Sequence, residues 1–132
     1  MADPIRVLIV DDEERFRDTL GKLLGRHGFV VRTAGGGEEA LRLLGEQGCD
    51  VIVLDVKMPG LSGEKALPLL RQACPGAEVL ILTGHASVDI ASAMIAGGAA
   101  DYLLKPCPTE ELEGAIRAVY DRRQATRPRG AS

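Results

Sequence analysis

The stretch IRVLIVDD, residues 5–12, is an apolar run rich in β-branched side chains that ends abruptly in two aspartates. A second run of the same kind, VIVL at residues 51–54, ends in Asp55. Runs that are apolar throughout, instead of alternating with polar residues, are typical of parallel strands buried on both faces of a sheet. The two segments are therefore predicted to be central strands with acidic side chains at their carboxyl ends.

Strand and helix candidates alternate along the chain. Three weaker apolar runs extend the set of strands to five, namely FVVRT at 29–33, EVLIL at 78–82 and ADYLL at 100–104. The segments between and after the strands carry apolar residues at helical spacing. These helix candidates cover the residues between Asp12 and Gly28, then 38–46, 63–73, 87–96, and the chain from about 109. Five alternations of strand and helix predict a doubly wound α/β fold.

The ends of several predicted helices carry specific signals. Asp12 is the candidate N-cap of the first helix, and Gly28 lies beyond its end. Pro68 falls inside the third helix, where a proline predicts a kink or a later helix start. Beyond Tyr120 the chain becomes polar and rich in arginine, which predicts fraying or a linker. The chain is thus divided into a domain at 1–122 and a tail at 123–132.

Composition sets the class of protein. With 132 residues, 45% of them hydrophobic, the chain suits one domain whose core needs no disulfide or structural metal. Its 16 basic and 19 acidic residues give a net charge of -3, which argues against direct nucleic-acid binding. Cys49, Cys74 and Cys107 have no CxxC or zinc-ligand spacing and are interpreted as reduced thiols. Without a signal peptide or an apolar stretch of about 18 residues, we expect a cytoplasmic protein that does not contact a membrane.

Five polar side chains follow the ends of the predicted strands. Asp11 and Asp12 come after the first strand, Asp55 after the third, Thr83 after the fourth and Lys105 after the fifth. The carboxyl ends of parallel strands meet at one edge of an open α/β sheet, where such folds bind their ligands. We therefore expect these five side chains to converge in space.

Their chemistry indicates phosphoryl transfer. Three carboxylates brought together repel one another unless a cation lies between them. Mg2+ or Mn2+ is predicted, because hard divalent ions prefer oxygen ligands and often share a phosphate oxygen with the protein. In this scheme Asp55 is the nucleophile. Lys105 neutralises one phosphoryl oxygen, and the Thr83 hydroxyl donates a hydrogen bond to another.

Four short motifs carry a resemblance to a known family. They are VDD at 10–12, VLDVKMPG at 53–60, LTGHA at 82–86 and DYLLKP at 101–106. In this order, and on these elements, they resemble the receiver domains of bacterial two-component response regulators over residues 5–122. The resemblance implies a flavodoxin-like, five-stranded parallel sheet in the order 2-1-3-4-5, with five helices.

The resemblance also assigns roles to the polar residues at this edge of the sheet, which we call the acidic edge: Asp11, Asp12, Asp55, Thr83 and Lys105. It makes Asp55 the phosphoacceptor, Asp12 and Asp55 direct metal ligands, and Asp11 a ligand that acts mainly through water. The backbone carbonyl of Lys57 is a further metal ligand. Lys105 is the lysine that pairs with the phosphoryl group, and in the family it is often joined to the next residue, Pro106, by a cis peptide.

Further residues are implied to transmit or tune the signal. Thr83 is similar to the switch hydroxyl of the family, and Tyr102 to the aromatic residue that turns inward when the threonine is drawn toward phosphate. Lys57 and His85 occupy positions that tune the lifetime of the phosphoryl group. The implied partners are a sensor histidine kinase or phosphotransfer protein, and a downstream effector or a second copy that docks on residues 87–96 and 100–122.

Other interpretations of the same residues stay open. Asp11 and Asp12 fit a helix N-cap, Lys105 a solvated charge, and Tyr102 an ordinary half-buried strand residue. At the level of function, the chemistry is self-catalysed and the chain is not expected to be a turnover enzyme. The alternatives are a metal-dependent phosphatase with an aspartyl nucleophile, which resembles Asp-x-Asp where this chain has Lys57, and an unphosphorylated pseudo-receiver scaffold.

Overall fold

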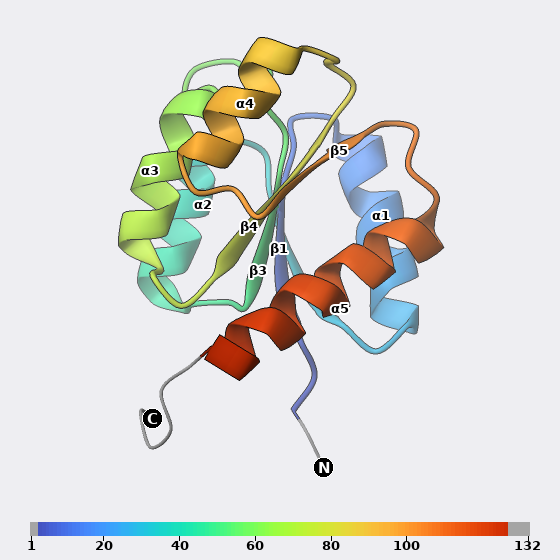
Figure 1. Cartoon of the computed structure of the whole chain (residues 1–132). Coiled ribbons are helices and arrows are strands. Elements are labelled where there is room, and N and C mark those ends of the chain that lie inside the picture. Colours follow the sequence, from blue (N-terminus) through green and yellow to red (C-terminus); the bar gives the residue numbers. More distant parts are fainter. Residues whose placement is uncertain (1–2, 127–132) are drawn as a thin grey trace.

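The computed structural model describes residues 3–126 and contains one parallel sheet of five strands in the order β2-β1-β3-β4-β5 (Figure 1). The strands are β1 (Arg6–Val10), β2 (Val30–Ala34), β3 (Val51–Leu54), β4 (Glu78–Thr83) and β5 (Asp101–Leu104). The helices are α1 (Glu14–Arg26), α2 (Gly37–Glu46), α3 (Gly63–Ala73), α4 (Val88–Ala96) and α5 (Thr109–Thr126). The predicted fold class, strand order and number of helices are confirmed.

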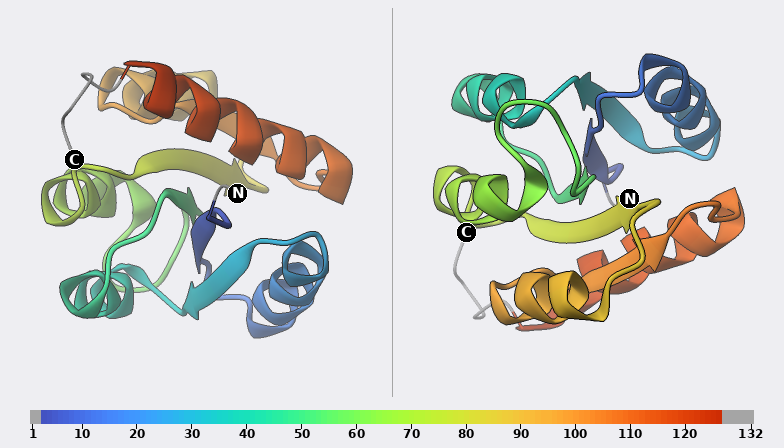
Figure 2. Two further views of the ribbon diagram at one scale, coloured as in Figure 1. Left: turned by 90° about the horizontal axis from the view of Figure 1, so that it is seen from below. Right: turned by 90° about the horizontal axis from the view of Figure 1, so that it is seen from above.

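Helices cover both faces of the sheet (Figure 2). On one face, residues such as Leu8, Ile52 and Ile81 pack with buried side chains of α2, α3 and α4. On the other face, the alternate strand residues, such as Ile9 and Val53, pack with buried side chains of α1 and α5. Burial on both sides explains why the central strands are apolar at every position instead of at every second one.

The register of the sheet brings polar residues to its carboxyl-terminal edge, at the top of Figure 1. Val10 is paired with Leu54, so Asp11 and Asp55 leave adjacent strands at the same level. The amide of Asp55 donates a hydrogen bond to the carbonyl of Val10 at 3.0 Å. On the other side of β4, the amide of Lys105 donates to the carbonyl of Thr83 at 2.8 Å. The topology therefore gathers side chains that are far apart in the sequence.

Two expectations about helix starts differ from the structure. The N-cap of α1 is Glu13 and not Asp12, because the Asp11 carboxylate accepts a hydrogen bond from the Glu13 amide and moves the helix start by one residue. The predicted later start near Pro68 is wrong. Helix α3 begins at Gly63, where the Ser62 side chain accepts from the Lys65 amide. Burial of the apolar face of α3 offsets the hydrogen bond that the proline removes.

Helix α5 extends further than its apolar pattern predicts. It continues through Thr126, so residues 123–126 of the expected tail are helical, and Arg123 donates to the carbonyl of Pro75 at 2.6 Å. Anchoring of this kind keeps a polar final turn helical. Residues 127–132, including Arg127 and Arg129, lie outside the described residues. Among the described helices, none is long and apolar enough to span a bilayer.

Candidate functional site

The buried polar side chains mark the site. Among residues 3–125, the buried positions with a polar or charged side chain are Asp11, Asp55 and Thr83, which are 3%, 6% and 1% exposed. All three lie at the carboxyl ends of β1, β3 and β4. Burial of a charged group is unfavourable unless it has partners, so this arrangement indicates a functional and not a packing role.

Three carboxylates converge at this edge. Asp11, Asp12 and Asp55 each offer one oxygen, and the three oxygens lie within 4.8 Å of one another. Asp12 is exposed, so the cluster opens to solvent on one side. The donor set consists of hard oxygen atoms with an open side, which fits a divalent cation that keeps part of its water shell. The predicted convergence of the three aspartates is confirmed by this geometry.

Lys105 places a positively charged ammonium group beside these carboxylates. Its Nζ lies 2.7 Å from Oδ2 of Asp11 and 3.9 Å from Oδ2 of Asp55. Burial alone would lower the pKa of Lys105, but the hydrogen bond and charge of Asp11, together with the charge of Asp55, raise it above its ordinary value. The side chain is therefore a charged ammonium group and not a free lysine on the surface. The backbone of Lys105 is joined to Pro106 by a cis peptide bond, as the resemblance implied.

The pKa of Asp55 is raised above its ordinary value. Burial raises the pKa of its carboxyl group, and the charge of Asp11 raises it further. The Thr83 hydroxyl, the charge of Lys105 and the amide of Val56, which donates to Oδ1 at 2.8 Å, work against this rise. A carboxylate whose charge is poorly compensated binds a cation readily, and it is a more basic nucleophile than an exposed aspartate.

Thr83 and Tyr102 meet at one residue of the loop between β4 and α4. The Thr83 hydroxyl accepts a hydrogen bond from the His85 amide at 3.2 Å. The Tyr102 hydroxyl donates to the His85 carbonyl at 2.7 Å, and its ring packs against the core on the α4 face. The backbone of His85 thus joins the two side chains, a link that the sequence does not show.

Lys57 and Gly63 lie near Asp55. The side chain of Lys57 is exposed and borders a hollow of about 410 Å3 that Met58, Glu64 and Ile90 also line. Gly63, for which the sequence gives no specific signal, lies against the backbone at Asp55, since a Cβ on it would be 2.4 Å from the backbone oxygen of Asp55. Glycine after a short turn is too common a pattern to have predicted this contact.

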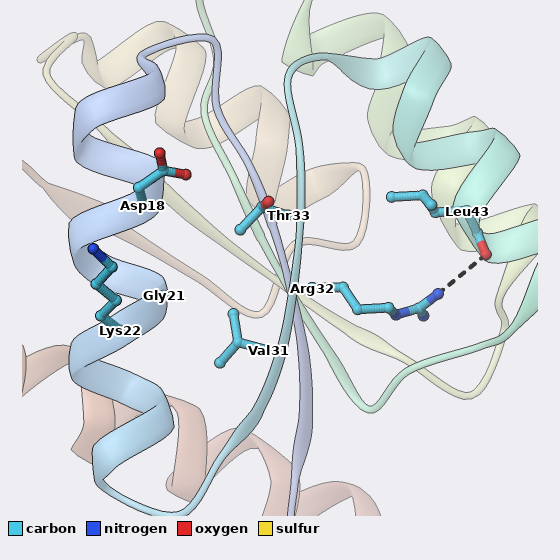
Figure 3. A pocket seen from close by; sticks show the side chains of 7 residues that line it. All are labelled: Asp18, Gly21, Lys22, Val31, Arg32, Thr33 and Leu43. Atoms are coloured by element: carbon cyan, nitrogen blue, oxygen red, sulfur yellow. Dashed lines mark hydrogen bonds between the residues drawn. The ribbon is translucent and has the colours of Figure 1, made fainter.

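A larger hollow lies elsewhere. About 530 Å3 in volume, it runs along the edge strand β2 beside α1 (Figure 3). Asp18 and Lys22 project from α1, whereas Arg32 is turned toward α2 and donates to the carbonyl of Leu43 at 3.3 Å. Its charged groups do not converge on a common point, so the acidic edge remains the candidate site.

Comparison with known proteins identifies the family. Residues 7–117 match the response regulator receiver domain. The chain is 40% identical over 119 residues to the response regulator MprA of Mycolicibacterium vanbaalenii, covering 90% of this chain and 52% of the relative. It is 37% identical over 125 residues to the probable transcriptional regulatory protein TcrX of Mycobacterium tuberculosis, covering 95% and 53%. The chain spans about half the length of these relatives.

Solved structures agree. A response regulator from Burkholderia pseudomallei with a phosphorylated aspartic acid, calcium ion and citrate superimposes with a TM-score of 0.82 at 35% identity, covering 92% of this chain and 71% of that one. A receiver domain protein from Clostridium thermocellum gives a TM-score of 0.86 at 34% identity, covering 93% and 99%. The chain belongs to the response regulator receiver domain family of two-component systems.

Proposed function

We propose that Asp55 accepts a phosphoryl group and that this domain is a phosphorylation-dependent signalling switch. One observation carries the proposal: the Asp55 carboxylate is buried at the sheet edge with two further carboxylates within 4.8 Å and the Lys105 ammonium 3.9 Å away. An acidic group is seldom buried beside two others unless a cation and an anionic ligand complete the site. The similar protein from Burkholderia pseudomallei carries a phosphorylated aspartic acid.

Mg2+, or Mn2+, is the proposed cofactor. Oxygens of Asp11, Asp12 and Asp55 would hold it, with the backbone carbonyl of Lys57 as a further ligand. The ion would neutralise the phosphoryl oxygens during transfer. The Burkholderia pseudomallei protein contains a calcium ion as well as a phosphorylated aspartic acid, which supports a divalent cation as the cofactor.

Asp55, Lys105 and Thr83 each have a separate proposed role in phosphoryl transfer. A carboxylate oxygen of Asp55 attacks phosphorus, the bond to the donor breaks, and the electron pair leaves with the donor group. Lys105 pairs with a phosphoryl oxygen, and the Thr83 hydroxyl donates a hydrogen bond to another. Water later cleaves the acyl phosphate and regenerates Asp55, so the domain catalyses its own modification and release and turns over no separate substrate.

Thr83 and Tyr102 are proposed to relay the change. Both are hydrogen-bonded to the backbone of His85, so a shift of Thr83 toward the phosphoryl group alters the loop that precedes α4. The output surface is the face of α4, β5 and α5, where Val88, Ile95 and Leu104 are exposed apolar residues. An effector protein or a second copy would bind there, and Lys57 and His85 would tune the phosphoryl lifetime.

The partner that donates the phosphoryl group is proposed to be a sensor histidine kinase or a phosphotransfer protein. We propose a cytoplasmic location and no direct contact with nucleic acid or membrane for this domain, which we take as residues 1–122. The phosphatase alternative lacks support, because the second residue after Asp55 is the exposed Lys57 and not an acid. A pseudo-receiver scaffold would not need the three aspartates and Lys105 to lie together, so it does not explain their convergence.

The test is intact mass after incubation with acetyl phosphate and Mg2+. One added phosphoryl group is expected in the wild type, and none in Asp55→Asn or in the presence of EDTA. Asp101→Asn is the matched control, since Asp101 is exposed at the opposite end of β5 and should leave the modification unchanged. Modification of Asp55→Asn would contradict the assignment. Unchanged binding of a partner by Asp55→Asn would favour the scaffold, and steady hydrolysis of a phosphomonoester the phosphatase.

A further inference from the structure

An aromatic ring lies against the lysine of the site. The Nζ atom of Lys105 is 4.1 Å from the centroid of the Phe16 ring. Phe16 belongs to the first turn of α1 and is partly buried against the core on the α1 and α5 face. The two residues come from opposite ends of the sequence, and only the fold brings them together. An ammonium group this close to a ring face is attracted by the ring's electron density.

The contacts of Lys105 are unequal. Its Nζ is 2.7 Å from Asp11, 3.4 Å from Glu13 and 3.9 Å from Asp55. Asp55 is thus the most distant of the three carboxylates, beyond the range of a hydrogen bond. The lysine side chain is 16% exposed although it carries a flexible four-carbon stem. Asp11, Glu13 and the Phe16 ring together hold the ammonium group close enough to Asp55 for an ion pair but too far for a hydrogen bond.

We propose that Phe16 is a positioning residue for the phosphoryl-transfer site, acting through Lys105. Its ring fixes the ammonium group next to Asp11 and beyond hydrogen-bond distance of Asp55. The Asp55 oxygens therefore carry no hydrogen bond from Lys105 that the metal ion and the phosphoryl donor would have to displace. The inference rests on the proposed function. Fixing Lys105 in advance means that its side-chain entropy is already lost when the phosphoryl group arrives, and this speeds the transfer.

The alternative is that Phe16 only fills the core. The two roles differ in what a leucine at this position would do. Leucine keeps the apolar contact with the core but has no ring face, whereas tyrosine keeps both. A packing role therefore predicts no particular dependence on Lys105, and a positioning role predicts that any effect vanishes once Lys105 is gone.

The first measurement is the rate of phosphorylation by acetyl phosphate with Mg2+. Phe16→Leu is expected to slow it about two- to fivefold, the factor that corresponds to a cation–π contact of about 0.5–1 kcal/mol. Phe16→Tyr is expected to restore the rate. In a Lys105→Met background, Phe16→Leu is expected to have no further effect. A slowing of equal size in that background, or no slowing at all, would overturn the proposal.

Phe29→Leu is the matched control. Phe29 lies in the same core cluster, away from the acidic edge. The Arg117 guanidinium lies over its ring, 4.6 Å from the centroid. The substitution thus removes the same kind of contact without touching Lys105. We expect the phosphorylation rate to stay at the wild-type value. A slowing that matches Phe16→Leu would assign the effect to core packing and overturn the positioning role.

A second measurement does not depend on phosphorylation. The chain has four lysines, Lys22, Lys57, Lys65 and Lys105, so the side-chain 15N signals of lysine-labelled protein can be assigned by substitution. The Lys105 ammonium signal is expected to be protected from exchange with water in the wild type and lost in Phe16→Leu, with the backbone amide spectrum preserved. Retained protection in Phe16→Leu would refute the inference. An unphosphorylated wild type with a protected Lys105 signal would instead refute the proposed function alone.

Discussion

Gly63, the first residue of α3, lies directly against the backbone of Asp55. A Cβ on Gly63 would be 2.4 Å from the Asp55 carbonyl oxygen and 2.7 Å from the Cα of Val56. Its amide also donates to the carbonyl of Val56 at 2.7 Å. The start of α3 therefore packs directly on the backbone of Asp55 and Val56, and only a residue without a side chain fits between them.

Gly63→Ala is expected to lower the free energy of unfolding by about 1–3 kcal/mol, the usual effect of overpacking a close contact. It should also slow phosphorylation, because the backbone of Asp55 and Val56 must move. Gly114→Ala is the control. Gly114 lies inside α5, and its added Cβ would have no atom within 4 Å apart from its neighbours and the backbone of its own helix, so the protein should gain up to about 1 kcal/mol. Urea denaturation measures both. A neutral Gly63→Ala would show that the contact is loose.

Asp55→Asn is expected to stabilise the metal-free protein at neutral pH. Because the folded pKa of Asp55 is raised, the native state of the wild type binds a proton at this residue more tightly than the unfolded chain does. Its stability therefore falls as pH rises from the ordinary aspartate pKa through the folded one. Thermal unfolding in EDTA from acid to neutral pH measures the difference between the two proteins.

That difference should shrink toward zero once the pH falls below the ordinary aspartate pKa, where both states of the wild type are protonated at this residue. Adding Mg2+ at neutral pH should reverse the order, since the ion stabilises the protein that binds it more tightly. A difference that does not change with pH would contradict the electrostatic explanation.

Tyr102→Phe removes the hydrogen bond to the His85 carbonyl and keeps the ring. We expect the free energy of unfolding to fall by about 1 kcal/mol and amide exchange in the loop between β4 and α4 to become faster. The proposed phosphorylation of Asp55 should persist, because the Tyr102 hydroxyl bonds to the His85 carbonyl and not to the Asp55 carboxylate. Tyr120→Phe, on the α5 side of the core, is the comparison. Unchanged exchange near His85 would argue against the link between Tyr102 and this loop.

His27→Gln is expected to raise the pKa of Glu113 toward its ordinary value. In the folded protein, a hydrogen bond from His27 lowers this pKa, and the guanidinium of Arg117 lowers it further. A lowered carboxyl pKa stabilises the fold above the unfolded pKa, and the gain is lost as pH falls through the folded value. A 13C NMR titration of the Glu113 carboxyl measures the shift. An unchanged midpoint in the variant would show that His27 does not contribute.

The sequence predicted the architecture well because the residue types of each strand indicate how deeply that strand is buried. A central parallel strand such as β3 is buried on both faces, so it must be apolar throughout, and the acidic residue that ends it is conspicuous. Since parallel strands share one carboxyl-terminal edge, the order of elements alone predicted that Asp11, Asp55, Thr83 and Lys105 would meet. Helix ends were predicted less well, because local hydrogen bonds such as that of Asp11 with the Glu13 amide move them.

The sequence by itself thus determined the fold class, the strand positions and the set of side chains at the acidic edge, since each follows from residue type and periodicity. Only the tertiary structure decided which of those side chains touch. It placed the Lys105 ammonium on Asp11 and the Phe16 ring, joined Thr83 and Tyr102 through the His85 backbone, and closed Gly63 onto Asp55. The contacts of Lys105 and that of Tyr102 with His85 link residues distant in the chain. All of these distances depend on how the helices and loops pack against the sheet, which no local pattern of residues encodes.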